Sequence, residues 1–149
     1  PERLGNGCAV PSARRWAHKM KTYESEWWTI NFPNDWEAEE GEESIAIYSE
    51  QGVGAVQVSA ARTGNGPVTD ADLRDFAKEH LEAGARTKDV NCGDFVGFYF
   101  HFGTEDMYQR QWWLRHDDTM VLVTYTAAPE DKGKEETVVD GIVASLKKR

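Results

Sequence analysis

The chain has 149 residues, of which 40% are hydrophobic and 11% are aromatic, including six tryptophans. This length is typical of one domain with its own core, and the composition is too apolar for a disordered chain. The 26 Asp and Glu outnumber the 17 Lys and Arg, and the net charge of −9 argues against a nucleic-acid partner. No apolar run approaches the roughly 20 residues that cross a bilayer, so we expect no membrane span.

Residues 1–19 differ from the rest of the chain in charge and in periodicity. They hold four basic residues and one acidic residue, which leaves 13 basic and 25 acidic residues and a net charge of −12 for residues 20–149. They show neither the period of a strand nor that of a helix. We interpret residues 1–19 as a leader outside the domain, either a tag or upstream read-through, and residues 20–149 as a single domain. The alternative is an N-terminal arm that packs Trp16 onto the domain.

The first half of the domain alternates between apolar and polar residues. This alternation predicts a first strand from Tyr23 to Phe32, ended by Pro33. Six of the nine residues in 35–43 are acidic, which is typical of a solvated loop. Two β-rich runs, 44–49 and 55–61, flank a glycine-containing turn and predict a hairpin.

The second half begins with a helix that we expect to be capped by Thr69 and Asp72 and to end at Gly84. Three strands are then predicted at 95–102, 107–116 and 119–127, and a last helix carries apolar residues at helical spacing over 138–146. Lys147, Lys148 and Arg149 would complement the negative end of its dipole. The fold class is α+β, an antiparallel sheet of about six strands with two helices in the order β-β-β-α-β-β-β-α.

Three segments resemble a known group of folds. The run from Trp28 to Trp36, the run from Gln111 to Ala127 and the closing helix with Ser145 and Leu146 are similar to the PsbP-like fold, which includes PsbP, Mog-type Ran-binding proteins and DcrB-like bacterial domains. The resemblance implies a sheet sandwiched by helices and a history of binding proteins rather than catalysing reactions. The leader resembles read-through of the sites that flank integron gene cassettes, which implies a bacterial cassette protein of unknown function.

Two pairs of consecutive tryptophans predict two different sheet faces, because side chains alternate along a strand. We expect the helices to cover the more apolar face, with Trp28, Ile30, Phe32, Trp112 and Leu114. The other face would then present aromatic and polar side chains together: Trp27, Tyr48, Gln57, Ser59, Tyr99, His101, Gln109, Gln111, Trp113 and Arg115. Such a mixture is typical of recognition surfaces. The alternative is that a helix covers this face too, which would place all four tryptophans in the core.

The sequence offers weak candidates for chemistry. His116, Asp117 and Asp118, with His101 nearby, could bind a divalent metal, but a hairpin turn explains the two aspartates equally well. Cys92 could be a nucleophile with His101 as its base, yet we expect an inert thiol at the start of a strand. Cys8 and Cys92 show no zinc or disulfide pattern, which favours a reducing, cytoplasmic compartment. We therefore expect no catalytic residues, no metal and no cofactor.

These observations favour a protein-binding module that is not an enzyme, with an adaptor, chaperone or immunity-like role. The binding residues would be Trp27, Tyr48, Tyr99, His101, Trp113 and Arg115 on the aromatic face, together with Glu37, Glu39, Glu40, Glu42 and Glu43 of the acidic loop. The acidic loop would steer a basic protein partner. A homodimer through the aromatic face is a structural variant. The alternative function is a small-molecule binder or enzyme, with a pocket lined by Trp28, Trp112, Tyr99 and His101.

Overall fold

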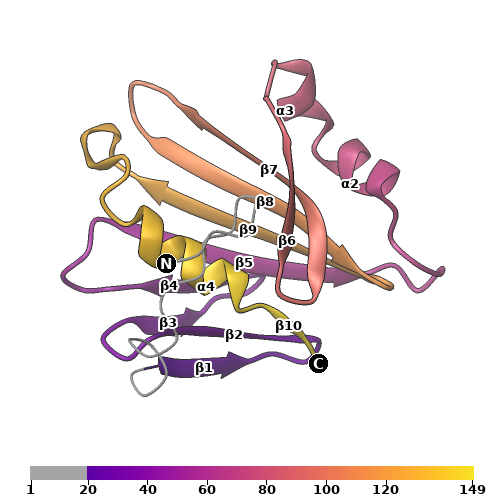
Figure 1. The fold of residues 1–149 in the computed structure, drawn as a ribbon, viewed down its shortest axis with the longest axis horizontal. Coiled ribbons are helices and arrows are strands. Elements are labelled where there is room, and N and C mark those ends of the chain that lie inside the picture. Colours follow the sequence, from indigo (N-terminus) through magenta and orange to yellow (C-terminus); the bar gives the residue numbers. More distant parts are fainter. Residues whose placement is uncertain (1–19) are drawn as a thin grey trace.

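The computed structural model describes residues 20–149, which form two antiparallel sheets and three α-helices (Figure 1). The smaller sheet has the order β1-β2-β10 and contains β1 (Met20–Glu24), β2 (Trp28–Pro33) and β10 (Lys147–Lys148). The larger sheet has the order β3-β4-β5-β9-β8-β7-β6. Its strands are β3 (Glu37–Glu40), β4 (Ile45–Tyr48), β5 (Gly54–Arg62), β6 (Lys88–Cys92), β7 (Phe95–Gly103), β8 (Tyr108–His116) and β9 (Thr119–Ala127). Predictions about residues 1–19 lie outside the described residues.

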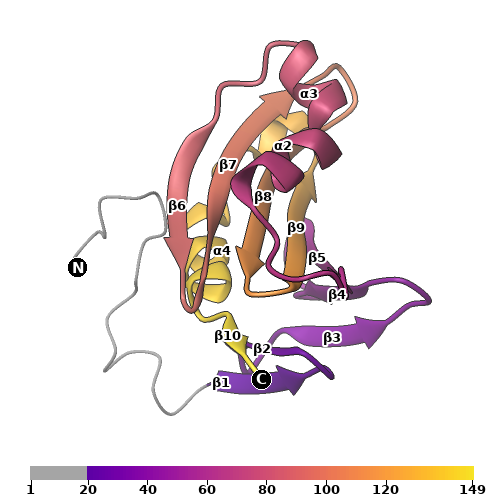
Figure 2. The ribbon, with the colours of Figure 1, turned by 90° about the vertical axis from the view of Figure 1, so that its right-hand side faces the viewer.

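Helices pack on both faces of the larger sheet (Figure 2). One face packs against α4 (Glu136–Ala144) and the smaller sheet, and this core contains Trp28, Ile30, Phe32, Trp112 and Leu114 as expected. The opposite face is partly covered by α2 (Asp70–Phe76) and α3 (Lys78–Glu82), which bury Phe98, Phe100 and Trp113. A short 3-10 helix, η1 (Pro129–Asp131), joins β9 to the segment that leads to α4. None of the helices in residues 20–149 is long and apolar enough to cross a membrane.

The α+β class, the antiparallel pairing and the strands β4, β5, β7, β8 and β9 are confirmed. The single first strand is wrong, because the chain turns at Ser25 and forms the hairpin β1–β2. The Ser25 backbone N–H donates to the Trp28 carbonyl at 2.9 Å, and its hydroxyl accepts the Trp28 N–H at 3.2 Å. Alternation continues on both sides of this turn, with Tyr23 opposite Ile30, which is why the pattern looked continuous.

Four other predictions need correction. The acidic run is not wholly a loop, because residues 37–40 form the edge strand β3. The predicted helix over 69–84 is divided at Ala77 into α2 and α3, and Phe76, the last residue of α2, is 59% exposed. The single sheet of about six strands is wrong, because residues 20–149 form ten strands in two sheets, and β6 was not predicted at all. Lys147 and Lys148 do not extend the last helix but pair with Thr29 and Trp28 as β10.

Candidate functional site

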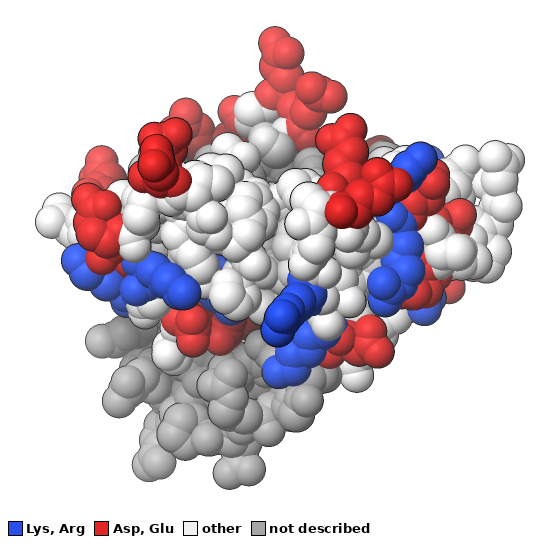
Figure 3. Space-filling model, turned by 90° about the horizontal axis from the view of Figure 1, so that it is seen from above, with Lys and Arg blue, Asp and Glu red and all other residues white. Residues whose placement is uncertain are grey.

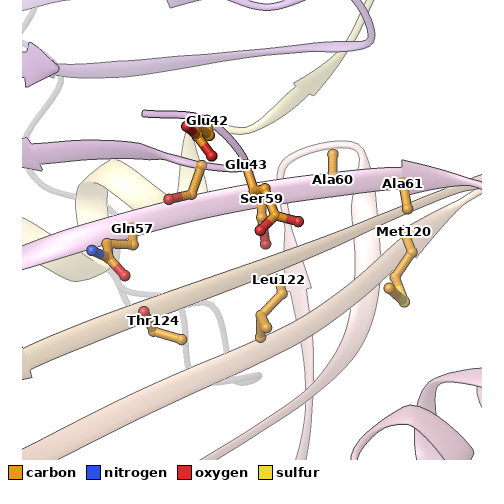
Figure 4. A pocket seen from close by; sticks show the side chains of 10 residues that line it. Glu42, Glu43, Gln57, Ser59, Ala60, Ala61, Met120, Leu122 and Thr124 are labelled. Carbon is orange, nitrogen blue, oxygen red and sulfur yellow. The ribbon is translucent and has the colours of Figure 1, made fainter. Parts of the chain in front are cut away.

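Part of the face that carries α2 and α3 is left open along β5 and β9. Gln57, Ser59 and Ala61 of β5 lie opposite Thr124, Leu122 and Met120 of β9, and directly opposite residues of an antiparallel pair share one face. All six side chains are exposed or half-buried. Figure 4 shows these side chains along the two neighbouring strands. The open strip is therefore a mixed surface of small, amide, hydroxyl and apolar groups.

The turn between β3 and β4 projects carboxylates beside this strip. The turn is closed by the Gly41 N–H, which donates to the Ser44 carbonyl at 2.8 Å, and it carries Glu42 and Glu43, both exposed. Both glutamates line the same hollow as Ser59 of β5, and these side chains are drawn in Figure 4. Because a closed turn holds its backbone in place, these two carboxylates are presented at a defined position next to the sheet.

Two hollows flank this turn and share part of their lining. A hollow of about 660 Å³ faces Gln57, Met120, Leu122 and Thr124. A hollow of about 410 Å³ faces the β1–β2 hairpin. We call the two hollows together the acidic groove. Both are lined by Glu42, Glu43, Ser44, Ser59 and Ala60, and the smaller hollow is also lined by Tyr23, Ser25, Glu26, Trp27, Trp28, Glu40, Gly41, Ile45 and Val58.

The carboxylates of the acidic run differ in their partners. Glu37 pairs with Lys21 at 3.5 Å, Glu39 accepts the Tyr48 hydroxyl at 3.0 Å, and Glu40 accepts the Tyr23 hydroxyl at 2.7 Å. This hydrogen bond to Glu40, together with burial and the negative charge, raises the pKa of Tyr23. By contrast, Glu42 and Glu43 make no ion pair or side-chain hydrogen bond with any residue in 20–149.

Trp27 forms an aromatic wall of the groove beside Glu26, a third carboxylate without an ion pair among the described residues. The Trp27 side chain is half-buried and packs against the main core. The guanidinium of Arg62 lies 5.5 Å from the centre of its ring and is itself paired with Asp118 at 3.0 Å. The groove thus combines free negative charge with an indole ring that already contacts one cation.

The structure brings only part of the predicted site together. Trp27, Glu40, Glu42 and Glu43 line the groove. Tyr48 lies on the same face of the larger sheet as Gln57 but does not line the acidic groove. Glu37 and Glu39 do not line the groove either. Trp113 is only 7% exposed because α2 and α3 pack over it, and its indole N–H donates to the Gln111 side chain at 2.9 Å. Arg115 is half-buried on this face and lies directly opposite Met120, which lines the groove, but Arg115 does not line the groove itself.

The prediction that Tyr99 and His101 lie on the aromatic face with Trp113 was wrong. Tyr99 lies opposite Trp112 and His101 lies opposite Arg110, so both belong to the α4 side of the sheet. The sequence pattern of β7 is ambiguous because Phe95 and Phe98 are both fully buried, one on each face. The predicted pocket lined by Trp28, Trp112, Tyr99 and His101 is replaced by packed core at the two tryptophans, which are 4% and 0% exposed.

The residues that the sequence offered as a metal site and as a nucleophile with its base do not come together in the structure. His116 contacts the Asp94 carbonyl through Nδ1 at 2.8 Å and Asp117 through Nε2 at 3.4 Å, whereas His101 pairs with Arg110 farther along β8. Within residues 20–149 no cluster of three potential metal ligands is found. Cys92 is fully buried and disulfide-bonded, which corrects the prediction of an inert thiol, while the other cysteine, Cys8, lies outside the described residues.

Sequence reasoning missed the other groove residues, notably Tyr23, Glu26, Met120 and Leu122. Glu26 was hidden because the turn at Ser25 was taken as part of a strand. Met120 and Leu122 share the parity of Thr124 on β9, so the alternation could have placed them on the face of Gln57. Their apolar character argued for burial, which the structure shows to be partial.

On the face seen in Figure 3, the negative charge is not continuous. In the view of Figure 3, Asp and Glu form several separate groups with Lys and Arg between them, around a central area of uncharged residues. A specific electrostatic site is therefore better defined by local unpaired carboxylates than by the total charge.

Comparison with known proteins shows the fold but no function. No family model matches the chain, and no curated protein matches it. Its structure is similar to cyanobacterial PsbP (CyanoP) from Synechocystis sp. PCC 6803, with a TM-score of 0.61 and 10% identity over 88% of this chain and 93% of that one. It is also similar to a protein from Bacteroides thetaiotaomicron, with a TM-score of 0.65 and 23% identity over 88% of this chain. The chain spans about half of that protein, 49% of its length. The chain has a PsbP-like fold, and an integron origin finds no support.

Proposed function

We propose that the protein is a binding module, without catalytic activity, that holds a basic segment of a partner protein in the acidic groove. The observation that carries this proposal is the convergence of three carboxylates without ion-pair partners, Glu26, Glu42 and Glu43, around two hollows and an indole wall. Like charges held close together repel one another, and a cationic ligand relieves that repulsion.

The groove offers each part of such a segment a matching surface. A Lys or Arg side chain between the exposed Glu42 and Glu43 would form two ion pairs, each of which contributes about 0.2–1 kcal/mol. Trp27, which already contacts the Arg62 guanidinium, offers the segment an aromatic surface at the wall of the groove. Met120 and Leu122, both half-buried, offer contact to an apolar side chain farther along the segment.

The proposal is tested by calorimetric titration with an unstructured peptide of alternating Arg and Val residues. The double variant Glu42→Gln/Glu43→Gln should weaken binding at least tenfold and reduce its dependence on salt. The matched control is Glu105→Gln/Asp106→Asn, which removes two exposed charges at the β7–β8 turn, away from the groove. Equal weakening by both double variants, or no binding by the wild type, would overturn the proposal.

A further inference from the structure

A separate hollow of about 550 Å³ lies where α3 ends beside β7. It is at the β7 side of the larger sheet, whereas the acidic groove is at the β5 side, with β9 and β8 between them. Its lining includes His80 from α3, the turn at Ala83–Arg86 that follows α3, and Phe100–Phe102 from β7. This hollow plays no part in the proposed function.

Three aromatic rings form one wall of this hollow. The His80 ring centre lies 5.3 Å from that of Phe100 and 5.7 Å from that of Phe102, and the two phenyl rings are stacked with their centres 6.3 Å apart. Phe100 is 1% exposed and sits in a paired strand, so this wall is held firmly. Flat ring faces of this kind pack well against a planar, apolar molecule.

The space beside the rings is kept open by a turn of small residues. The Gly84 N–H donates to the Leu81 carbonyl and the Ala85 N–H donates to the His80 carbonyl, each at 3.1 Å. Gly84 has φ +98°, a left-handed conformation that favours glycine and lets the chain leave α3 sharply. Ala83 and Ala85 add only methyl groups to the lining.

The polar groups at this hollow are of one kind. His80 and Arg86 supply N–H donors, His101 points its side chain to the opposite face of the sheet, and none of the described residues that line the hollow carries a carboxylate. This is notable in a chain with 26 acidic residues and a net charge of −9. Arg86 is exposed at the rim, where a guanidinium can donate two parallel hydrogen bonds to a carboxylate.

We infer that this hollow binds a small, planar, apolar molecule that carries a carboxylate, with its flat body against the partly exposed Phe102 ring, which the buried Phe100 supports, and its carboxylate toward Arg86 and His80. The rings supply the contact area, and the donors select the anion over a neutral analogue of the same shape. The site is independent of the acidic groove, whose carboxylates would repel the same ligand.

The test uses naphthoate as the probe and naphthamide as its neutral counterpart, titrated by calorimetry against the full chain. Naphthoate should bind at least tenfold more tightly than naphthamide, and Arg86→Gln should remove that difference. His80→Gln should weaken binding of both probes, because it removes a ring from the wall, and should weaken naphthoate more, because it also changes a donor to the carboxylate. The matched control is Lys78→Gln, an exposed residue of α3 that does not line the hollow and should leave binding unchanged.

Amide chemical-shift mapping with naphthoate gives a second readout that does not depend on the variants. Shifts confined to 80–86 and 100–102 support the site. Equal affinity for the two probes, an equal effect of Lys78→Gln and Arg86→Gln, shifts centred elsewhere, or no binding of naphthoate would each overturn the inference. The acidic groove's peptide titration is unaffected by any of these results.

Discussion

Arg110 on β8 and Asp140 on α4 form an ion pair inside the protein, with side chains that are only 4% and 3% exposed. The guanidinium also donates from Nε to the Tyr99 hydroxyl at 2.9 Å and lies 4.6 Å from the ring centre of Trp112. Burial opposes the charge on Arg110, but Tyr99 and Asp140 outweigh it and raise the pKa of Arg110. This contact links α4 to the larger sheet in the interior of the protein.

Removing one partner of this pair should be strongly destabilising. Asp140→Ala leaves the guanidinium buried without its carboxylate, and we expect the free energy of unfolding to fall by about 3–5 kcal/mol in urea denaturation. The double variant Arg110→Met/Asp140→Leu, which removes both charges, should recover most of that loss. A loss below about 1 kcal/mol for Asp140→Ala would show that the pair does not hold α4 in place.

The protein should lose stability at alkaline pH through its buried tyrosines. Burial is the main cause that raises the pKa of Tyr108 to about 12, and burial with a hydrogen bond to Glu135 raises the pKa of Tyr125 further. Below pH 10 both tyrosines are neutral in the folded and the unfolded chain, so their ionisation does not lower the free energy of unfolding there. Above pH 10 the unfolded chain ionises first, and each tyrosine makes stability fall by up to about 1.4 kcal/mol per pH unit.

This alkaline loss is checked by urea denaturation at several pH values between 10 and 12, with tyrosinate absorbance as a second signal. Tyr108→Phe should give a shallower decline than the wild type over this range. Identical pH profiles would contradict the assignment of Tyr108 as a tyrosine that ionises only on unfolding.

Gly93 should tolerate no side chain. It has φ +65°, and a Cβ at this position would collide with the Leu146 carbonyl, which accepts the Asp94 N–H at 3.0 Å. Gly93→Ala should therefore lower the midpoint of thermal unfolding by far more than Gly64→Ala. Gly64 has a similar φ of +71° but no atom within 4 Å of its Cβ position, so only the conformational strain of about 1–2 kcal/mol applies there. Equal effects would contradict the close approach of the 93–94 turn to Leu146.

The capping box at α2 should contribute measurably to stability. The Thr69 hydroxyl accepts the Asp72 N–H at 3.1 Å, and the Asp72 carboxylate accepts the Thr69 N–H at 2.9 Å, which confirms the predicted cap. Thr69→Ala should lower the free energy of unfolding by about 1 kcal/mol, whereas Thr69→Ser should change it little. Equal values for the two variants in urea denaturation would show that the hydroxyl is not the cause.

The elements that the sequence predicted correctly depend on local signals. The Thr69–Asp72 cap, the β4–β5 hairpin and the Asp117 turn, with φ +49°, are all encoded within a few residues. Strand β10 could not be predicted in this way, because Lys147 and Lys148 form a strand only by pairing with Thr29 and Trp28 at the other end of the chain. Such a pairing has no local periodicity.

The sequence predicted some of the residues of the candidate site but not how they are arranged. The acidic run and Trp27 were named from their residue types, and the structure places Trp27 and only Glu40, Glu42 and Glu43 of the run at one groove. The prediction that Trp113 lies at the surface was wrong, because α2 and α3 cover its face of the sheet. Period-2 alternation defines two faces without indicating which of them a helix covers. Arg110 shares the parity of Trp112 and Leu114, so a buried charge was present in the pattern but not inferred from it.

The most direct measurement of the central claim is a map of backbone amide shifts in an isotope-labelled chain titrated with the Arg and Val peptide. A protein that holds basic segments in the acidic groove will show shifts at residues 25–28, 41–44, 57–61 and 120–124, which weaken as salt is raised. Shifts that are absent from residues 41–44, or that are equally strong in Glu42→Gln/Glu43→Gln, would contradict the assignment of the acidic groove as the binding site.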